Sequence, residues 1–298
     1  MKRGFSIITV SKGRLEHLKQ SLPRMLGQRA AEVIVVDFSC PQGTGDYVAE
    51  HFPAARVVKV EGETHFSNWK ARNAGAAAAT SEILVFCDAD TILADGAVKW
   101  LDSHFPPRSF GYFERGAMEG FNRKGLKLGK NQLRGFLVVA AKAFRRVGGY
   151  DELFEGYAAG ADTDLVDRLG LIGHAEFRLD SDIIADVIEH GNAERLEHHR
   201  EPTRISYGAG FIYRTAKFAL LKIKRMTELP LEVRRELYDS AHQAAANLGS
   251  STDSVSLTVA ITDRKVKMPR QLGYAEAAVK TSLRVEVSGK NRIEKIPD

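Results

Sequence analysis

The stretch that most constrains the fold runs from residue 81 to residue 90. Five apolar residues at 83–87 end abruptly at Asp88-Ala89-Asp90. A short apolar run of this kind indicates a strand buried on both faces, as in a parallel sheet. Ligands of open α/β sheets bind at the carboxyl ends of the strands. Asp88 and Asp90 therefore follow a strand at the ligand edge. Two hard oxygen donors there suit Mg²⁺ or Mn²⁺, and a solvated turn is the alternative.

Three further apolar runs, at residues 5–10, 32–37 and 54–60, predict strands that precede this one. They alternate with predicted helices, of which 14–25 carries leucines at helical spacing and 68–80 consists largely of small residues. This alternation predicts βαβ units and a mainly parallel sheet. The carboxyl ends of parallel strands share one edge, so Thr9, Asp37 and Asp88 are expected together. That grouping favours a nucleotide pocket.

Beyond residue 95 the pattern predicts a helix at 96–105, a strand at 135–142 and a tight turn at 148–152. Residues 112–128 are interpreted as either paired strands or a loop. A helix at 162–172 carries Asp162 in its first turn, where the helix dipole favours a carboxylate. Strands are expected at 175–178 and 183–187, and the second runs into His190.

Glu201-Pro202 marks a predicted boundary between a domain at 1–200 and an extension at 201–298. The extension is predicted to hold helices at 204–225 and 231–248, followed by short strands at 254–261 and 282–287. We expect it to dock an acceptor or to mediate homo-oligomerisation. The first helix is basic and amphipathic. It is interpreted as a solvated face over the core, as a contact with anionic lipid, or as a contact with an acidic glycan.

Composition narrows the function classes. The chain has 298 residues, 44% hydrophobic and 27% charged residues, and a net charge of +5. These values are ordinary for a globular protein, and the positive charge is too small and too scattered to indicate nucleic-acid binding. We expect no secretory signal and no membrane-spanning segment, because no apolar run is long enough. Two cysteines without metal or redox spacing favour a reducing compartment, so we expect a cytoplasmic protein, with peripheral membrane contact as an extension of that prediction.

Several stretches resemble one family, the nucleotide-sugar glycosyltransferases of GT-A fold and family 2 type. The resemblance covers about the first 200 residues. It rests on five segments in the family's order: Ile7-Ile8-Thr9-Val10 with Arg14, Val33-Ile34-Val35-Val36-Asp37, Ala71-Arg72-Asn73-Ala74-Gly75, Asp88-Ala89-Asp90, and Gly148-Gly149-Tyr150-Asp151-Glu152. Residues 156–169 are also similar to the "GWGGEDxD" segment of galactosyl- and chondroitin-type members.

The resemblance implies a role for each matching residue. In the nucleotide site, Thr9 and Val10 would contact the base through the backbone and Asp37 would accept from uracil. Further contacts to the nucleotide and its ribose would come from Arg72, Asn73 and Asp88. Asp90 and His190 would hold the metal, and Asp162 would be the general base of an inverting transfer.

Two departures from the family pattern bear on these roles. Ala161 stands where a glutamate usually precedes the base, so the acceptor cannot be inferred from the family. The loop after the second strand reads Asp37-Phe38-Ser39-Cys40-Pro41 instead of "DDGS", which leaves its ribose contacts open. Asp164 is a rival base. The rival metal ligands are His174, His198 and His199.

The function expected from the resemblance is metal-dependent, inverting transfer of a sugar from a UDP-sugar to a hydroxyl of a glycan or lipid-linked acceptor. Two alternatives remain. One is a non-catalytic nucleotide- or glycan-binding module derived from this fold. The other is a sugar nucleotidyltransferase, which normally carries a Gly-rich basic loop after its first strand. The segment Ser11-Lys12-Gly13-Arg14 is a poor version of that loop.

Overall fold

The computed structural model describes residues 3–28, 31–113, 135–156, 160–199, 202–247, 254–267 and 276–288. The chain divides into two compact units. Unit 1 comprises Met1–Glu152 and Asp162–Arg200, and unit 2 comprises Leu153–Ala161 and Glu201–Asp298. All of the site residues named above lie in unit 1. The prediction of paired strands or a loop at 112–128 concerns residues that lie almost entirely outside the described part of the chain.

Unit 1 is built on a seven-stranded sheet of order β3-β2-β1-β4-β7-β6-β8. The strands β1 to β4 are parallel, β7 runs antiparallel to both of its neighbours, and β6 and β8 are again parallel. This confirms the predicted α/β fold with a mainly parallel sheet. The strand bounds are β1 Phe5–Ser11, β2 Ala31–Phe38, β3 Arg56–Val60, β4 Ile83–Phe86, β6 Ser109–Tyr112, β7 Leu137–Ala140 and β8 Ala175–Arg178.

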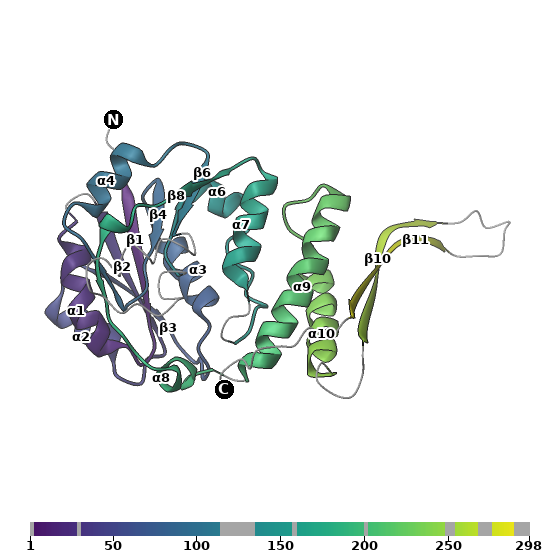
Figure 1. Cartoon of the computed structure of the whole chain (residues 1–298), viewed down its shortest axis with the longest axis horizontal. Coiled ribbons are helices and arrows are strands. Elements are labelled where there is room, and N and C mark those ends of the chain that lie inside the picture. Colours follow the sequence, from purple (N-terminus) through teal and green to yellow (C-terminus); the bar gives the residue numbers. More distant parts are fainter. Residues whose placement is uncertain are drawn as a thin grey trace. The chain divides into compact units, whose positions relative to one another are not determined.

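Helices cover both faces of this sheet (Figure 1). The chain moves outward from β1 to β3 and then returns to β4 on the other side of β1, so α1 and α2 lie on one face and α3 on the other. The point between β1 and β4, where the strand order reverses, is where ligands of such sheets bind. The helix bounds in this unit are α1 Leu15–Leu26, α2 Thr44–His51, α3 Asn68–Ala78, α4 Ala97–His104, α6 Ala141–Arg146, α7 Ala161–Leu171 and α8 Asn192–Leu196.

The apolar runs of the sequence form the buried core of unit 1. On one face of the sheet, Ile7, Val35 and Val85 pack in a single cluster with Leu18 and Leu22 of α1. On the other face α3 approaches closely. A Cβ at Gly75 would lie only 2.4 Å from Cγ2 of Ile8. The small residues of this helix therefore allow its backbone to rest almost directly on β1 and β2.

A small second sheet in unit 1 joins two distant segments. β5 (Thr91–Leu93) directly follows the Asp88-Ala89-Asp90 loop and pairs antiparallel with β9 (Ile184–Val187). The amide of Ile188 donates to the carbonyl of Asp90 at 2.8 Å. This pairing brings the segment that ends at His190 alongside the loop.

Unit 2 contains two helices, α9 (Thr203–Lys224) and α10 (Leu231–Asn247), and a two-stranded ribbon. The rings of Tyr213 and Tyr238 meet edge to face at 5.3 Å, and Phe154 packs on Tyr213 at 5.0 Å. The ribbon consists of β10 (Ser254–Lys267) and β11 (Glu276–Ser288). It corrects the prediction of short strands. The pairing continues past Ile261 across an irregularity between Thr262 and Arg264, where the apolar-polar alternation breaks.

Within the described part of the chain, no helix combines the length and the apolar character that crossing a membrane requires.

Candidate active site

The candidate site lies at the carboxyl edge of β1, β2 and β4. Asp37 is the penultimate residue of β2, and Asp88 follows β4 by two residues. β4 is too short to carry a long side-chain pattern of its own, but its four residues are all buried. This rigid strand fixes where the Asp88-Ala89-Asp90 loop starts, directly beside the switch point between β1 and β4.

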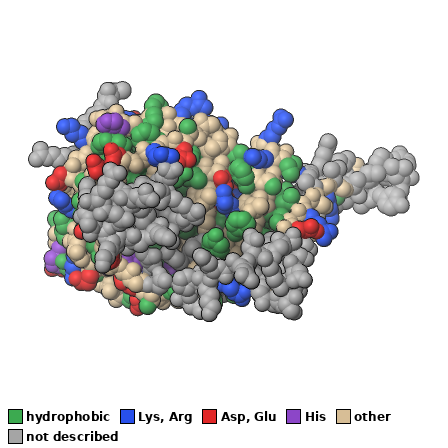
Figure 2. All heavy atoms as spheres, in the orientation of Figure 1, with side chains coloured by type: hydrophobic (Ala, Val, Ile, Leu, Met, Phe, Trp, Pro, Cys, Tyr) green, Lys and Arg blue, Asp and Glu red, His purple; other side chains and the backbone are tan. Residues whose placement is uncertain are grey.

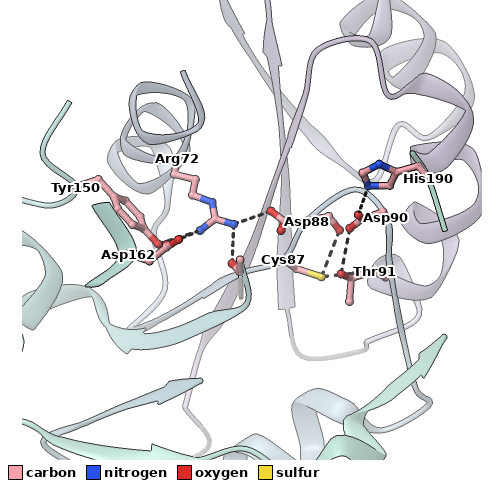
Figure 3. Close-up of polar contacts among 9 residues, drawn as sticks. Arg72, Cys87, Asp88, Asp90, Thr91, Tyr150, Asp162 and His190 are labelled. Atoms are coloured by element: carbon pink, nitrogen blue, oxygen red, sulfur yellow. Dashed lines mark hydrogen bonds and ion pairs between the residues drawn. The ribbon is translucent and has the colours of Figure 1, made fainter. Parts of the chain in front are cut away.

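Arg72 joins two predicted site carboxylates. This α3 residue is only 1% exposed, and its guanidinium donates to Asp88 Oδ1 at 2.6 Å and to Asp162 Oδ1 at 3.4 Å. It also donates to the hydroxyl of Tyr150 at 3.0 Å and to the carbonyl of Gly135 at 2.6 Å. Figure 3 shows the guanidinium between Asp88 on one side and Asp162 with Tyr150 on the other. Four segments far apart in the sequence thus meet at one cation.

The electrostatics of this cluster follow from its burial. Burial alone would lower the pKa of Arg72, but Tyr150, Asp88 and Asp162 more than offset this, so its pKa is raised. Burial raises the pKa of the Asp88 carboxyl, although Arg72 opposes the change. Burial likewise raises the pKa of Tyr150, so its hydroxyl stays neutral at ordinary pH. Arg72 is therefore a permanent positive charge that orients its acidic neighbours.

Gly135 belongs to this site because no side chain fits there. A Cβ at this position would lie 1.8 Å from Oδ2 of Asp88. The glycine lets the chain pass against the carboxylate while its carbonyl accepts from Arg72. This role was not predicted from the sequence. The only signal was a glycine at the start of a predicted strand.

Asp162 and its rival Asp164 lie in different environments, although both are in the first turn of α7. The side chain of Asp162 is 37% exposed and faces Arg72. Asp164 is buried, and its Oδ2 accepts from Nε and Nη2 of Arg168 at 2.8 and 2.6 Å. An accessible carboxylate can approach a substrate, whereas Asp164 is held in an internal ion pair. The geometry therefore favours Asp162 as the base candidate.

Asp90 and His190 lie side by side although 100 residues separate them. The imidazole Nε2 lies 2.8 Å from Oδ2 of Asp90, and both side chains are largely buried. Figure 3 shows this pair beyond Asp88, away from Arg72. The carboxylate is a donor that suits Mg²⁺ or Mn²⁺, and the imidazole is a donor for divalent transition metals, so the pair can hold a divalent cation. The Nδ1 of His190 is buried and has no hydrogen-bond partner among the described residues, so the residues fit a bound ion or ligand.

The other histidines contribute differently. The ring of His17 in α1 lies 5.4 Å from that of His190, and its Nε2 is 3.3 Å from the carboxylate of Glu194. His17 was not singled out from the sequence, because one histidine on a helix carries no motif. A Cβ on Gly13 would come within 2.3 Å of Nε2 of His198, so that ring packs against the β1 loop. The ring of His199 packs edge to face on Phe66.

Asp37 acts as a backbone cap in this structure. Its Oδ1 accepts from the amide of Cys40 at 2.7 Å and its Oδ2 from the amide of Gly45 at 2.6 Å. The carboxylate therefore holds the loop after β2 and the start of α2. Each oxygen keeps a second lone pair for a further donor.

The remaining predicted nucleotide contacts are Thr9, Val10 and Asn73. Thr9 and Val10 are buried in β1, and the Thr9 hydroxyl has no partner within the described residues. Asn73 is occupied by the 148–152 turn. Its Nδ2 donates to the carbonyl of Tyr150 and to Glu152, and its Oδ1 accepts from the amide of Tyr150. Asn73 thus fixes the position of Tyr150 relative to Arg72.

The loop after β1 lacks a basic side chain suited to binding phosphate. The ammonium of Lys12 donates to the carbonyls of Phe38, Ser39 and Glu63 at 3.2, 3.0 and 2.7 Å. Arg14 is paired with Glu194. Both cations hold neighbouring backbone in place, an arrangement that weighs against the nucleotidyltransferase alternative.

Comparison with known proteins gives a family match for the first third of the chain. Residues 6–101 match the model of glycosyl transferase family 2. Over these residues the chain is similar to glycosyl transferase family 2. The match spans β1 to α4 and includes Asp37, Arg72 and the Asp88-Ala89-Asp90 loop. It confirms the predicted family and enzyme class. No curated protein matches the sequence.

Solved structures support the same fold. S. aureus TarS 1–349 in complex with UDP-GlcNAc is 13% identical, with a TM-score of 0.54 over 83% of this chain and 73% of that one. The same protein in complex with UDP is 12% identical, with a TM-score of 0.52 over 83% and 72%. The mannosyltransferase PcManGT from Pyrobaculum calidifontis, in complex with GDP-Man and Mn²⁺, is 16% identical over 85% and 77%, at a TM-score of 0.49. The two TarS structures, with TM-scores above 0.5, establish that this chain shares their GT-A fold.

Proposed function

We propose that this protein transfers a sugar from a UDP-sugar to an acceptor hydroxyl, with inversion at the anomeric carbon. The observation that carries the proposal is the Arg72 guanidinium, which joins the carboxylate after β4 to the exposed carboxylate of α7. A donor-side aspartate and a candidate base are thereby held at one edge of a family 2 domain. The binding of UDP-GlcNAc by TarS, which shares this fold, supports a UDP-sugar donor.

The nucleotide would lie across the ends of β1 and β2. Backbone groups of Thr9 and Val10 would meet the base, and a free lone pair of Asp37 would accept from uracil N3–H. Asp88 would face the ribose. Arg72 and Asn73 would act on the nucleotide through the carboxylate and the turn that they hold, since both side chains are already engaged.

Asp90 and His190 would hold Mn²⁺ or Mg²⁺, and such an ion supplies positive charge that offsets the charge developing on the departing diphosphate. The adjacency of the two side chains supports this assignment. The family 2 domain offers further positive charge in Arg72, which lies on the other side of the same loop.

The reaction is a single displacement. Asp162 accepts the proton of the acceptor hydroxyl, and the oxygen attacks the anomeric carbon while the bond to the diphosphate breaks and UDP leaves. The Arg72 contact holds the Asp162 carboxylate in one direction. The acceptor proposed is a glycan or a lipid-linked glycan. The two free cysteines, Cys40 and Cys87, fit the proposed cytoplasmic location.

The donor site is tested by calorimetric titration of UDP into the wild type and Asp90→Ala, each with Mn²⁺ and with EDTA. We expect metal-dependent binding that Asp90→Ala loses. The matched control is Asp95→Ala, an exposed aspartate five residues further on, which should bind UDP as the wild type does. Absence of UDP binding under every condition would contradict the proposal.

The base is tested by UDP release across a panel of UDP-sugars and glycan acceptors. Asp162→Asn should bind UDP normally and lose at least about a hundredfold in turnover. Asp167→Asn, on the same helix, is the control. Undiminished turnover in Asp162→Asn would defeat the assignment. UDP binding without consumption of any sugar would instead favour the non-catalytic module.

A further inference from the structure

One face of α9 carries aromatic and basic side chains in a continuous stripe. Its members are three or four residues apart: Arg204, Tyr207, Phe211, Thr215, Phe218 and Lys222. At about 100° per residue they fall within an arc of about 80°. The helix has 22 residues, so the stripe is about 30 Å long. We call this set of six residues the α9 stripe.

Two of the three aromatic members of the α9 stripe are exposed, and the third, Phe218, is half-buried. Tyr207 is 50% and Phe211 55% exposed, and Met226 just beyond the helix is 39% exposed. The opposite face is buried, with Ile212, Tyr213 and Leu220 in the core of unit 2. Large aromatic side chains in water on one face of an otherwise packed helix indicate a surface that binds something. Figure 2 shows hydrophobic and basic side chains next to one another over the region of α9.

The charge of this helix has a single sign. Residues 203–226 contain six Lys and Arg residues and no Asp or Glu. One of the six, Lys217, is buried and paired with Glu228. The ammonium of Lys222 lies over the ring of Phe218 at 4.7 Å, so cation and aromatic share one surface. A surface of this sign suits an anionic partner.

We propose that the α9 stripe binds the anionic surface of a membrane. Exposed rings interleaved with Lys and Arg on a helix suit the headgroup region, where the rings enter the interface and the cations meet lipid phosphates. A glycan is the poorer candidate. Specific sugar sites orient their ligand with convergent polar groups in a concavity, whereas residues 203–226 contain no Asn, Gln, Asp or Glu and form a convex helix.

The test is co-sedimentation of the full chain with phosphatidylcholine vesicles that contain or lack phosphatidylglycerol. The wild type should bind only the anionic vesicles. Lys222→Gln, combined with Arg225→Gln at the exposed residue that ends the helix, should weaken that binding about tenfold or more, since each cation near the surface contributes. Tyr207→Ser with Phe211→Ser should weaken it comparably. Both variants should keep the wild-type circular dichroism and UDP titration, because none of the four changed residues belongs to the proposed donor site.

The matched control is Lys99→Gln with Lys142→Gln, which removes the same charge from exposed positions in unit 1. It should bind vesicles as the wild type does. Equal loss in the control, wild-type binding by the α9 variants, or no preference for anionic lipid would overturn the proposal. So would binding of heparin, used as an acidic polysaccharide, that depends on the α9 stripe while vesicles are not bound.

Discussion

The carboxyl ends of β2 and β4 carry aspartates in similar places that are held in different ways. The carboxylate of Asp37 accepts from two backbone amides of its own loop and helix. The carboxylate of Asp88 is held by the side chain of Arg72, which also reaches Asp162. The first acid is built into local backbone. The second depends on a distant cation, so its position is coupled to the base candidate and to the turn at Tyr150.

The largest effect is expected from removing the cation that holds Asp88 after β4. Arg72→Leu leaves two carboxylates without their cation, which typically costs about 3–5 kcal/mol for a buried pair. Asp88 and Asp162 are 31% and 37% exposed, so water offsets part of the loss and we expect a value near the lower end, about 3 kcal/mol. Urea unfolding measures it.

Arg72→Lys is the matched variant. It keeps the charge but cannot span both carboxylates. We therefore expect a large loss of turnover and only a small loss of unfolding free energy. A leucine variant as stable as the wild type would show that Asp88 and Asp162 do not depend on Arg72.

A second prediction tests the close packing of α3 on β1 and β2. In Gly75→Ala the new methyl group meets Ile8 and Val36 at 2.4 and 3.0 Å, so α3 must move off β1 and β2. We expect a loss of about 2 kcal/mol in unfolding free energy. Gly170→Ala is the control, because that helical glycine has nothing within 4 Å and should gain about 0.5 kcal/mol. Equal effects in the two variants would contradict the close approach.

The third prediction concerns pH at the edge near β2. Phe66 contacts both Phe38 of β2 and His199, and burial, with smaller effects of His198 and Arg14, lowers the pKa of His199 to about 4. The unfolded chain binds the proton near pH 6.5 and the folded chain does not. The contribution of the neutral His199 ring to the unfolding free energy should therefore be fully present above pH 6.5 and be lost as the pH falls toward 4. The expected loss is about 1–2 kcal/mol because the ring is only partly buried.

His199→Gln should remove this component from the pH dependence of urea unfolding, and exposed His51→Gln should not. Parallel pH profiles for His199→Gln and the wild type would exclude His199 as their cause.

The smallest effect on unfolding free energy is expected from replacing each of the two aspartates by asparagine. Asp37→Asn replaces an acceptor oxygen by an amide group that faces a backbone N–H, so stability should fall by about 1 kcal/mol. Asp88→Asn keeps an oxygen for Arg72 and should change stability less, while weakening UDP binding more. Urea unfolding and calorimetry separate the two effects. The reverse pattern would make Asp37 the ligand group and Asp88 the structural one.

Much of the fold could be predicted from local sequence pattern. Apolar runs predict buried strands, and their alternation with helices predicts a parallel sheet. The segments up to residue 90 follow this pattern. The length of the ribbon in unit 2 could not be read this way. The pairing of β10 with β11 continues past Ile261 because of partner hydrogen bonds, not because of the residues' own alternation.

The candidate site was also predictable only in part. Its residue types and their order along the chain came from the sequence, including the choice of Asp162 and His190, whose roles remain proposals. The tertiary structure decided which groups meet. It placed Arg72 on Asp88 and Asp162, tied Asn73 to the turn at Tyr150, and brought His17 beside His190.

The sequence by itself determined the strands, the small-residue helix and the acids at the strand ends, because periodicity and chain breaks are local properties. Only the tertiary structure decided that one aspartate is a backbone cap and another is held by a buried arginine. The cap on Asp37 uses amides 3 and 8 positions away, whereas Arg72 reaches carboxylates 16 and 90 positions away. A contact of that kind leaves no mark on the sequence around either partner.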